Sequence, residues 1–191
     1  MASSINAITT GSGGVITTAD NSGDLNIQSG GSTKIAVTSA GVAVTGLSKG
    51  SLPTGSVLQV VNVTYSTQVT SSSSTFADTG LTLSITPTSA TSKILALVQV
   101  AGVHKRTGNT RAQFKLFRNS TEIMYMDDYA ADTNTTANNA VGTVGTTYLD
   151  SPATTSSTTY KIQMCSAANT AEVRMNTGGG TSTITLMEIA A

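Results

Sequence analysis

Acidic and amide side chains gather in one polar stretch, predicted to form a long loop over residues 127–139 between two strands. Oxygen-rich loops can bind Ca²⁺, but this spacing matches no known calcium loop and no Glu completes the set. The same loop could contact a partner, because long loops on rigid β scaffolds often do. Nearby aromatic rings could stack on a sugar or simply pack at the strand end. The resulting candidate partner or receptor contacts are Tyr125, Asp127, Asp128, Tyr129, Asp132 and Asn134.

The chain has one histidine and one cysteine, and neither has the partners that catalysis or metal binding requires. A metal site needs three or four ligands, and no second His or Cys exists to join His104. A catalytic cysteine needs a histidine and an electropositive setting, which the alternating segment around Cys165 does not supply. We therefore interpret His104 as a solvated turn residue and Cys165 as a small buried hydrophobic residue.

Other patterns that resemble catalytic or cofactor motifs are equally incomplete. Gly11–Gly14 and Gly178–Gly180 lack the following helix and the Lys-Ser/Thr pair of a phosphate-binding loop, so we expect turns. The ten acidic residues show no paired arrangement in sequence, although Asp78 and Asp150 could still meet across a cleft. The sequence therefore predicts no enzyme, no cofactor and no metal.

The composition limits the classes of partner. Only 10% of the 191 residues are charged, against about 25% in an ordinary soluble domain, and the net charge is zero. A neutral chain without a basic run does not predict nucleic-acid binding. No apolar run approaches the roughly 18 residues of a membrane helix, and the first residues do not read as a signal peptide. We expect neither a nucleic-acid nor a membrane partner.

The residue pattern predicts an all-β protein. No segment shows the apolar spacing of a helix, whereas Thr and Val, which favour strands, are abundant. Turn signals recur every 8–15 residues after Pro53, which is typical of a sandwich, jelly roll or barrel. The segment over 93–103 is almost continuously apolar and predicts a central strand with both faces covered. The predicted strands are Ser56–Thr70, Leu81–Ile85, Lys93–Val103, Arg111–Arg118, Thr121–Met126, Ala140–Asp150, Thr158–Cys165, Ala171–Thr177 and Thr181–Ile189.

The first 48 residues differ from the rest. Their apolar segments are short, spaced about nine residues apart, and too small to close a core within one chain. The region is either disordered or completed by other copies of the chain, and the alternation of apolar residues favours the second interpretation. We predict an anchor or stalk over 1–48, a linker over 49–53 and a head over 54–191. Candidate residues for packing around a shared axis are Val15, Ile16, Leu25, Ile27, Ile35 and Val37.

Several stretches of the sequence together resemble virion structural proteins of tailed phages, particularly those of cyanobacteria and marine bacteria. The N-terminal stretches are Met1–Ala7, Gly14–Asp20, Leu25–Gln28 and Ala36–Thr38. The C-terminal stretches resemble the β domain of fibre-like proteins, and they are Gly55–Val61, Ser84–Ser89, Ser92–Leu95, Tyr148–Pro152, Thr159–Gln163 and Leu186–Ile189.

The resemblance implies a non-enzymatic homotrimer with a jelly-roll-like head, located on a virion that is assembled in the host cytoplasm. Such proteins are capsid decoration, cement or knob proteins, or else tail fibres and tail accessory proteins that reach a receptor or glycan on the host surface. The implied partners are other copies of the chain and a major capsid protein or tail proteins. Only about 50 residues precede the head, which favours a capsid knob over a long fibre.

Overall fold

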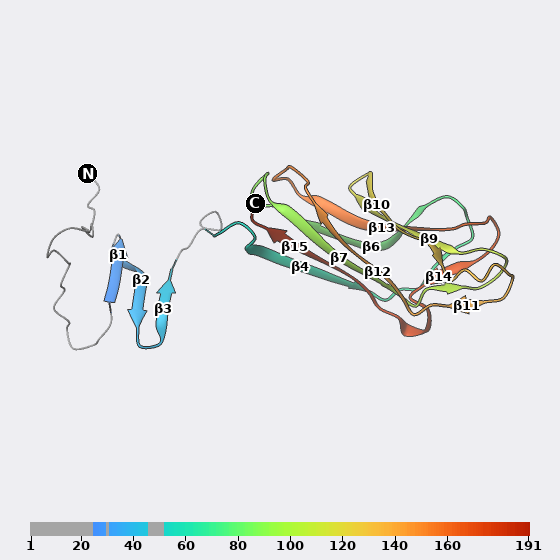
Figure 1. Ribbon diagram of the computed structural model, residues 1–191, viewed down its shortest axis with the longest axis horizontal. Coiled ribbons are helices and arrows are strands. Elements are labelled where there is room, and N and C mark those ends of the chain that lie inside the picture. Colours follow the sequence, from blue (N-terminus) through green and yellow to red (C-terminus); the bar gives the residue numbers. More distant parts are fainter. Residues whose placement is uncertain (1–24, 30, 46–51) are drawn as a thin grey trace. The chain divides into compact units, whose positions relative to one another are not determined.

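The computed structural model describes residues 25–29, 31–45 and 52–191 (Figure 1). The chain divides into two compact units, Met1–Ser48 and Lys49–Ala191. Apart from a 3-10 turn at Thr177–Gly179, every regular element among the described residues is a strand, so the all-β prediction is confirmed. Two candidate axis residues, Val15 and Ile16, and most of the predicted linker lie outside the described residues.

The N-terminal unit contains a three-stranded antiparallel sheet in the order β1-β2-β3. Each strand joins the next through a short turn, and Gly41 takes a positive φ of 125° where β3 begins. Among the described residues of this unit the sheet is a single layer, and a lone sheet of this size is marginal in water. The strands are β1 (Leu25–Ser29), β2 (Ser32–Thr38) and β3 (Gly41–Val44).

The C-terminal unit, here called the head, is built mainly from two four-stranded sheets in separate layers (Figure 1). One sheet has the order β12-β7-β15-β4 and the other has the order β10-β9-β13-β6. Their strands are β4 (Val57–Tyr65), β6 (Ala77–Ile85), β7 (Lys93–Ala101), β9 (Ala112–Arg118), β10 (Thr121–Ala130), β12 (Thr143–Asp150), β13 (Thr158–Ser166) and β15 (Ser182–Ile189).

The strand order of these two sheets is that of a jelly roll. Counted along the chain, the eight long strands of the described head occupy the positions 1-8-3-6 in one sheet and 2-7-4-5 in the other. Every pair of neighbours is antiparallel, and the last strand lies beside the first. Two interlocked Greek keys of this kind define the jelly roll. The predicted sandwich is therefore confirmed in its architecture.

A third, small sheet extends one of the two layers. It has the order β11-β8-β14-β5, and each of its strands adjoins in sequence the strand at the same position of β12-β7-β15-β4. The four long strands therefore continue, after an interruption, into four short strands in the same order. The short strands are β5 (Val69–Ser71), β8 (His104–Lys105), β11 (Asn139–Ala140) and β14 (Val173–Met175).

The core lies between the inward faces of the two large sheets. Along β7, β9 and β15 every second residue is buried, which is the period of two that places alternate side chains on opposite faces. The side chains that fill it are aliphatic with a few aromatic rings and methionines. The largest fully buried apolar residues are Leu81, Ile94, Phe114, Leu116, Tyr160, Ile162, Met164, Met175, Ile184 and Leu186.

A buried carboxylate ties the two large sheets together. Asp150, at the end of β12, accepts a hydrogen bond of 2.6 Å from the hydroxyl of Tyr160 on β13. It also pairs with the guanidinium of Arg118 on β9 at 2.8 Å. Burial, followed by the Asp150 carboxylate, raises the pKa of Tyr160 far above its ordinary value, so this hydroxyl remains a donor. These two contacts of Asp150 therefore link β12 of one sheet to β13 and β9 of the other.

A second buried carboxylate fixes the loop between β6 and β7. Glu188 of β15 accepts hydrogen bonds from the backbone N–H and the hydroxyl of Thr88, both at 2.7 Å, and from the side-chain amide of Gln59 at 2.6 Å. Burial alone would raise the pKa of Glu188, but these bonds and one from Ser92 outweigh it and hold the pKa below its ordinary value. Hydrogen bonds therefore stabilise the charge of Glu188, and no ion pair joins it to a cation among the described residues.

Several strand predictions need correction. The segment Ala140–Asp150 is divided between β11 and β12, and only Val173–Met175 of Ala171–Thr177 forms a strand. The segment 56–70 is not one strand, because pairing with β15 ends at Tyr65 and β5 pairs instead with β14. The apolar segment 93–103 has only one covered face, since its alternate residues Leu95 and Leu97 point away from the core and are partly exposed. Apolar side chains of this strand therefore also lie on the outward surface of the sheet.

Candidate functional site: the charged face of the head

The outward face of the sheet β10-β9-β13-β6, here called the charged face, carries most of the candidate contact residues. The predicted loop over 127–139 is wrong in its first part, because β10 continues to Ala130. Tyr125, Asp127, Asp128 and Tyr129 therefore lie on an edge strand of the sheet. Register shifts along β10 interrupt its alternation, which is why the polar run looked like a loop in sequence.

Asp128 is the centre of a hydrogen-bond network on this face. Its carboxylate accepts from the side-chain amide of Gln113 and from the hydroxyl of Tyr125 at 3.2 Å, and it pairs with Arg111 at 3.5 Å. Partial burial would raise the pKa of Asp128, but these bonds and the Arg111 charge outweigh it and lower the pKa. Burial and the same bond raise the pKa of Tyr125 to about 12. The carboxylate of Asp128 is thus engaged within the protein.

Lys115 lies between two aromatic rings. Its ammonium is 4.3 Å from the ring centre of Phe76 and 4.9 Å from that of Tyr125, and the two rings meet edge to face with centres 6.0 Å apart. It also pairs with Glu122 at 2.7 Å. Cation–π contacts of this kind at partly exposed sites contribute about 0.5–1 kcal/mol each. The small aromatic cage therefore holds a cation from the same chain.

Tyr129 is the more exposed of the two tyrosines of the candidate set. Its side chain is 63% exposed, and the Arg111 guanidinium lies 4.3 Å from the ring centre. Arg111 is fixed in turn by a 2.6 Å hydrogen bond from its Nε to the backbone oxygen of Asp128. The ring is therefore supported on one side by a positioned cation, and this arrangement suits stacking on a flat ligand such as a pyranose ring.

The remaining acidic residues of the set do not converge. Asp127 accepts a hydrogen bond from the backbone N–H of Tyr129, and Asp132 accepts one from the backbone N–H of Asn134. Each is therefore an ordinary turn or bulge contact. Among the described residues, no three acidic, histidine or cysteine side chains group in a way that could hold a metal ion.

The structure also places the other candidate residues. Cys165 is buried, as predicted, and burial raises the pKa of its thiol. His104 is not in a turn but on β8, and its Nδ1 is buried without a hydrogen-bond partner among the described residues. Asp78 lies on the charged face with Lys161 and Gln163, whereas Asp150 faces inward. The two carboxylates therefore do not form a catalytic pair.

Several residues of this face were not singled out from the sequence. Arg111, Gln113 and Lys115 were placed in an alternating strand, but no local signal pairs them with Asp128 or Phe76, which lie 15 or more residues away. Lys105, which follows His104, is fully buried, and its Nζ donates a hydrogen bond of 2.8 Å to the backbone oxygen of Thr135. That bond fastens the loop that follows β10.

The N-terminal sheet holds a second candidate surface, here called the aliphatic grid. Leu25 of β1 lies opposite Val37 of β2, which lies opposite Val42 of β3, and the next row repeats the pattern. Because directly paired residues share a face, all six side chains lie on one side of the sheet. Five of them are between 38% and 67% exposed. The grid consists of Leu25, Ile27, Ile35, Val37, Val42 and Val44.

No family model matches the chain, and neither does any curated protein. Among solved structures, the chain is similar to infectious bursal disease virus VP2 in a subviral particle, with a TM-score of 0.38 and 13% identity over 69% of this chain. It is also similar to a protein of T=1 particles derived from infectious bursal virus, with a TM-score of 0.29 and 10% identity over 70% of this chain. The matches span about a third of those chains, 32% and 36%. The described residues include no helix able to span a membrane.

Proposed function

We propose that this protein is a non-enzymatic structural component of a tailed-phage virion, assembled as a homotrimer. The observation that carries the proposal is the aliphatic grid, a six-residue apolar face on a sheet too small to fold around it. The resemblance of the sequence to phage virion proteins supplies the context. The head adds a rigid jelly roll whose described acidic, histidine and cysteine residues are engaged in packing and hydrogen bonds rather than arranged for catalysis.

Burial of the grid against other copies would stabilise the N-terminal sheet. Fully burying an aliphatic side chain is worth about 1.5–3 kcal/mol, so covering six half-exposed ones contributes about 5 kcal/mol per copy. The only charged residue of the described sheet, Lys34, falls on the opposite face by alternation from Ile35. A copy of the same sheet can therefore approach the grid without burying a charge.

Three copies fit this sheet geometrically. Three strands spaced about 4.8 Å apart make a face about 14 Å wide. Three such faces arranged as a triangular prism put the axis about 4 Å from each sheet, close to half of the roughly 10 Å that separates packed sheets. The aliphatic side chains then fill the axis and leave no channel. Two copies face to face would also cover the grid, so the number of copies has to be measured.

A matched pair of neighbouring substitutions tests the grid. Ile27→Asp places a charge in the grid, while Asn26→Asp places the same charge on the opposite face of β1. In light scattering, the first variant should form a smaller species than the wild type, and the second should keep the mass of the wild-type oligomer. Equal masses for the two variants would contradict the role of the grid.

Within the virion, we infer a capsid decoration or cement role. A cement protein stabilises a shell because it binds assembled neighbours and not free subunits. A head with few ionisable groups suits this role, since little of its stability depends on pH. Immunogold labelling of intact particles tests the location. Label over the capsid supports decoration, label confined to the tail supports a fibre or tail accessory role, and particles without label contradict the virion proposal.

The charged face favours the alternative, a tail protein that contacts a host-surface glycan. Tyr129 offers an exposed ring on a supporting guanidinium, with the amide and carboxylate groups of Gln113 and Asp128 nearby. Binding of the protein to an array of bacterial surface polysaccharides tests this function. Tyr129→Ala should abolish the signal, whereas Thr82→Ala, an exposed change on β6, should retain it. No wild-type binding, or equal binding by both variants, would contradict a glycan role for Tyr129.

A further inference from the structure

The outward face of the other large sheet, here called the neutral face, carries an aliphatic row that crosses all four strands. Leu149 of β12 lies opposite Leu95 of β7, Leu95 lies opposite Met187 of β15, and Met187 lies opposite Val60 of β4. The two end residues are 51% and 53% exposed. Monomeric proteins expose single apolar residues freely, but a contiguous row is a sign of an interface.

Neighbouring rows extend the apolar surface in one direction and replace it with hydroxyls in the other. Ile189 and Val57 pair with each other beside the aliphatic row. On the other side, Leu97 lies between Thr147 and Thr185. The surface thus changes from aliphatic to threonine-rich along the strands, and apart from Lys93 no charged side chain points outward from these four strands.

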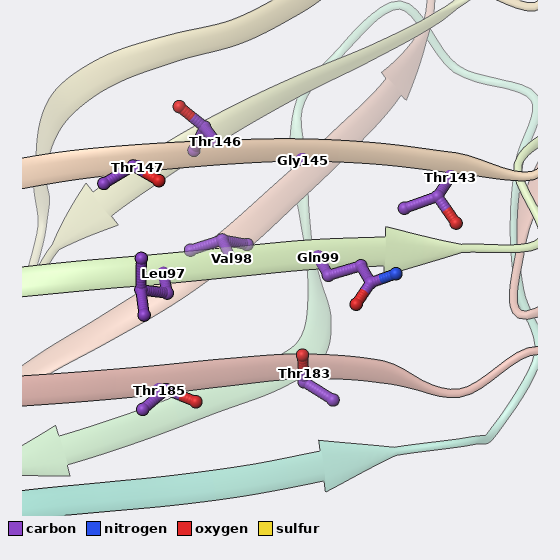
Figure 2. Close-up of a pocket in the computed structure, with 9 residues that line it drawn as sticks. All are labelled: Leu97, Val98, Gln99, Thr143, Gly145, Thr146, Thr147, Thr183 and Thr185. Carbon is purple, nitrogen blue, oxygen red and sulfur yellow. The ribbon is translucent and has the colours of Figure 1, made fainter.

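A shallow depression of about 610 Å³ lies in the threonine-rich part, on β12, β7 and β15. Gly145 contributes no side chain, and Figure 2 shows Thr143, Thr147, Thr183 and Thr185 around the gap with Leu97 and Gln99 between them. No aromatic ring and no charged group lines the depression, and its shallow, open shape would leave most of a small ligand exposed. It suits the side chains of a protein surface better.

The neutral face is large enough for a self-contact. Four strands about 4.8 Å apart and about eight residues long, at about 3.3 Å per residue, cover roughly 500 Å². Two such faces together bury roughly 1,000 Å², the lower end for a specific protein interface. The interface would have the apolar centre and hydroxyl-rich border that such contacts show.

We propose that the neutral face is the surface through which the heads of two copies of this chain contact each other. Copies side by side in the same direction bring aliphatic row against aliphatic row, so the face needs no complementary partner. Between two copies the contact is isologous, and around a threefold axis each head presents the same face to both neighbours. An identical face is also the partner that this surface accepts without electrostatic cost, because it contains no charge at its centre to repel its copy or be left unpaired. The charged face lacks this property.

The proposal is independent of the aliphatic grid but is compatible with it. If the N-terminal sheets associate, the heads are held at high local concentration, and a weak head contact then becomes populated. A test therefore has to report on the neutral face itself, in the full-length chain, and not only on total mass.

Cysteine crosslinking provides such a local test. Combining Leu149→Cys with Val60→Cys puts a thiol at each end of the aliphatic row, so that the Leu149 end of one copy faces the Val60 end of the next, and Thr82→Cys puts a thiol on the exposed surface of the opposite sheet. The native Cys165 is buried and remains inert in both variants. With a short bis-maleimide reagent, the first variant should give at least about ten times more covalent dimer than the second. Equal or absent crosslinking at both positions would overturn the proposal.

A charge substitution gives the second readout. In an Ile27→Asp background, which removes the grid, the heads alone should associate reversibly, and adding Leu149→Glu with Val60→Glu should weaken that association at least about tenfold in sedimentation velocity. Thr82→Glu is the matched control and should change it less than twofold. If the Ile27→Asp protein is a monomer at all concentrations and the variant with Leu149→Cys and Val60→Cys does not crosslink, the neutral face is wrong while the grid stands. An unchanged oligomer in every variant contradicts both.

Discussion

The two outward faces of the head are built on the same scaffold but with different chemistry. Three of the five side-chain ion pairs among the described residues lie on the charged face, together with all of the aromatic and cation–π contacts. The neutral face carries threonines and an aliphatic row, with Lys93 as its one outward charge in β4, β7, β12 and β15. One outward face of the jelly roll is thus charged, and the other is aliphatic and rich in threonine.

This difference suits the charged face to contact with water and the neutral face to contact with another copy. The charged side chains of the charged face pair with other groups of the same chain. The ion pairs and cation–π contacts between them hold the edge strand β10 against β9. Such charges keep that face hydrated and oppose edge-to-edge pairing of the sheet. The neutral face has no such protection and depends on burial. The faces therefore predict different responses to mutation, pH and salt.

The largest expected effect comes from breaking the link between the two layers. Asp150→Asn removes the carboxylate charge that pairs with Arg118 and accepts a hydrogen bond from Tyr160. Because loss of one partner of a buried pair is costly, the free energy of unfolding should fall by about 3 kcal/mol. Urea unfolding measures this loss. Asp132→Asn, an exposed loop change that preserves its turn contact, should cost less than about 0.5 kcal/mol. Equal losses would show that the layers are not held together at Asp150.

Glu188→Gln should have the next largest effect, about 2 kcal/mol, because hydrogen bonds to a charged acceptor are replaced by contacts with an amide. The pKa of Glu188 is lowered by folding, so its contribution is present above its unfolded pKa, near 4.5, and is lost as the pH falls through the lower folded pKa. The stability difference between wild type and variant should therefore be larger at pH 7 than at pH 3. The same difference at both pH values would contradict this assignment.

On the charged face, Asp128→Asn should cost about 1 kcal/mol, since its network is partly exposed. The same change should lower the pKa of Tyr125 from about 12, while burial keeps it above the ordinary value for tyrosine. Ultraviolet titration of tyrosinate formation measures this shift. A pKa that does not move would show that the Tyr125–Asp128 hydrogen bond is not formed in solution.

The smallest effect is expected for the exposed pair of Asp78 with Lys161. Asp78→Asn should cost below about 1 kcal/mol, as exposed ion pairs do. The contribution of the pair to the free energy of unfolding should also be mostly lost in 1 M salt, where charges are screened within about 3 Å. Unfolding at low and high salt measures both. A larger cost that persists in salt would mean that this pair is better shielded from water than its exposure indicates.

Alternation predicted most of the long strands, and residues that share its period of two fill the core. Phe114 with Leu116 and Ile184 with Leu186 are spaced two apart and are buried together. The order of the strands was not predictable, because Greek-key and meander connections place the same turns between the same strands. The prediction of one continuous strand over 56–70 was wrong for a related reason, because the break after Tyr65 depends on partners more than 100 residues away.

The candidate site was predictable in its residue types and not in its geometry. Tyr125 and Asp128 were named from a polar cluster, but bulges in β10 hide the alternation that would have marked a strand. The partners of Asp128 come from β9, and no local sequence signal connects them. The neutral face was missed because an apolar strand such as 93–103 looks equally suited to burial on both faces, and only the structure shows that one face is uncovered.

The mass of the full-length protein in solution tests the central claim most directly. The account of a self-associating structural protein predicts a trimer of about 58 kDa in multi-angle light scattering, three times the chain mass of 19.3 kDa, and a shift to a smaller species for Ile27→Asp but not Asn26→Asp. A wild-type protein that remains a 19.3 kDa monomer at all concentrations, with the aliphatic grid exposed, would contradict it.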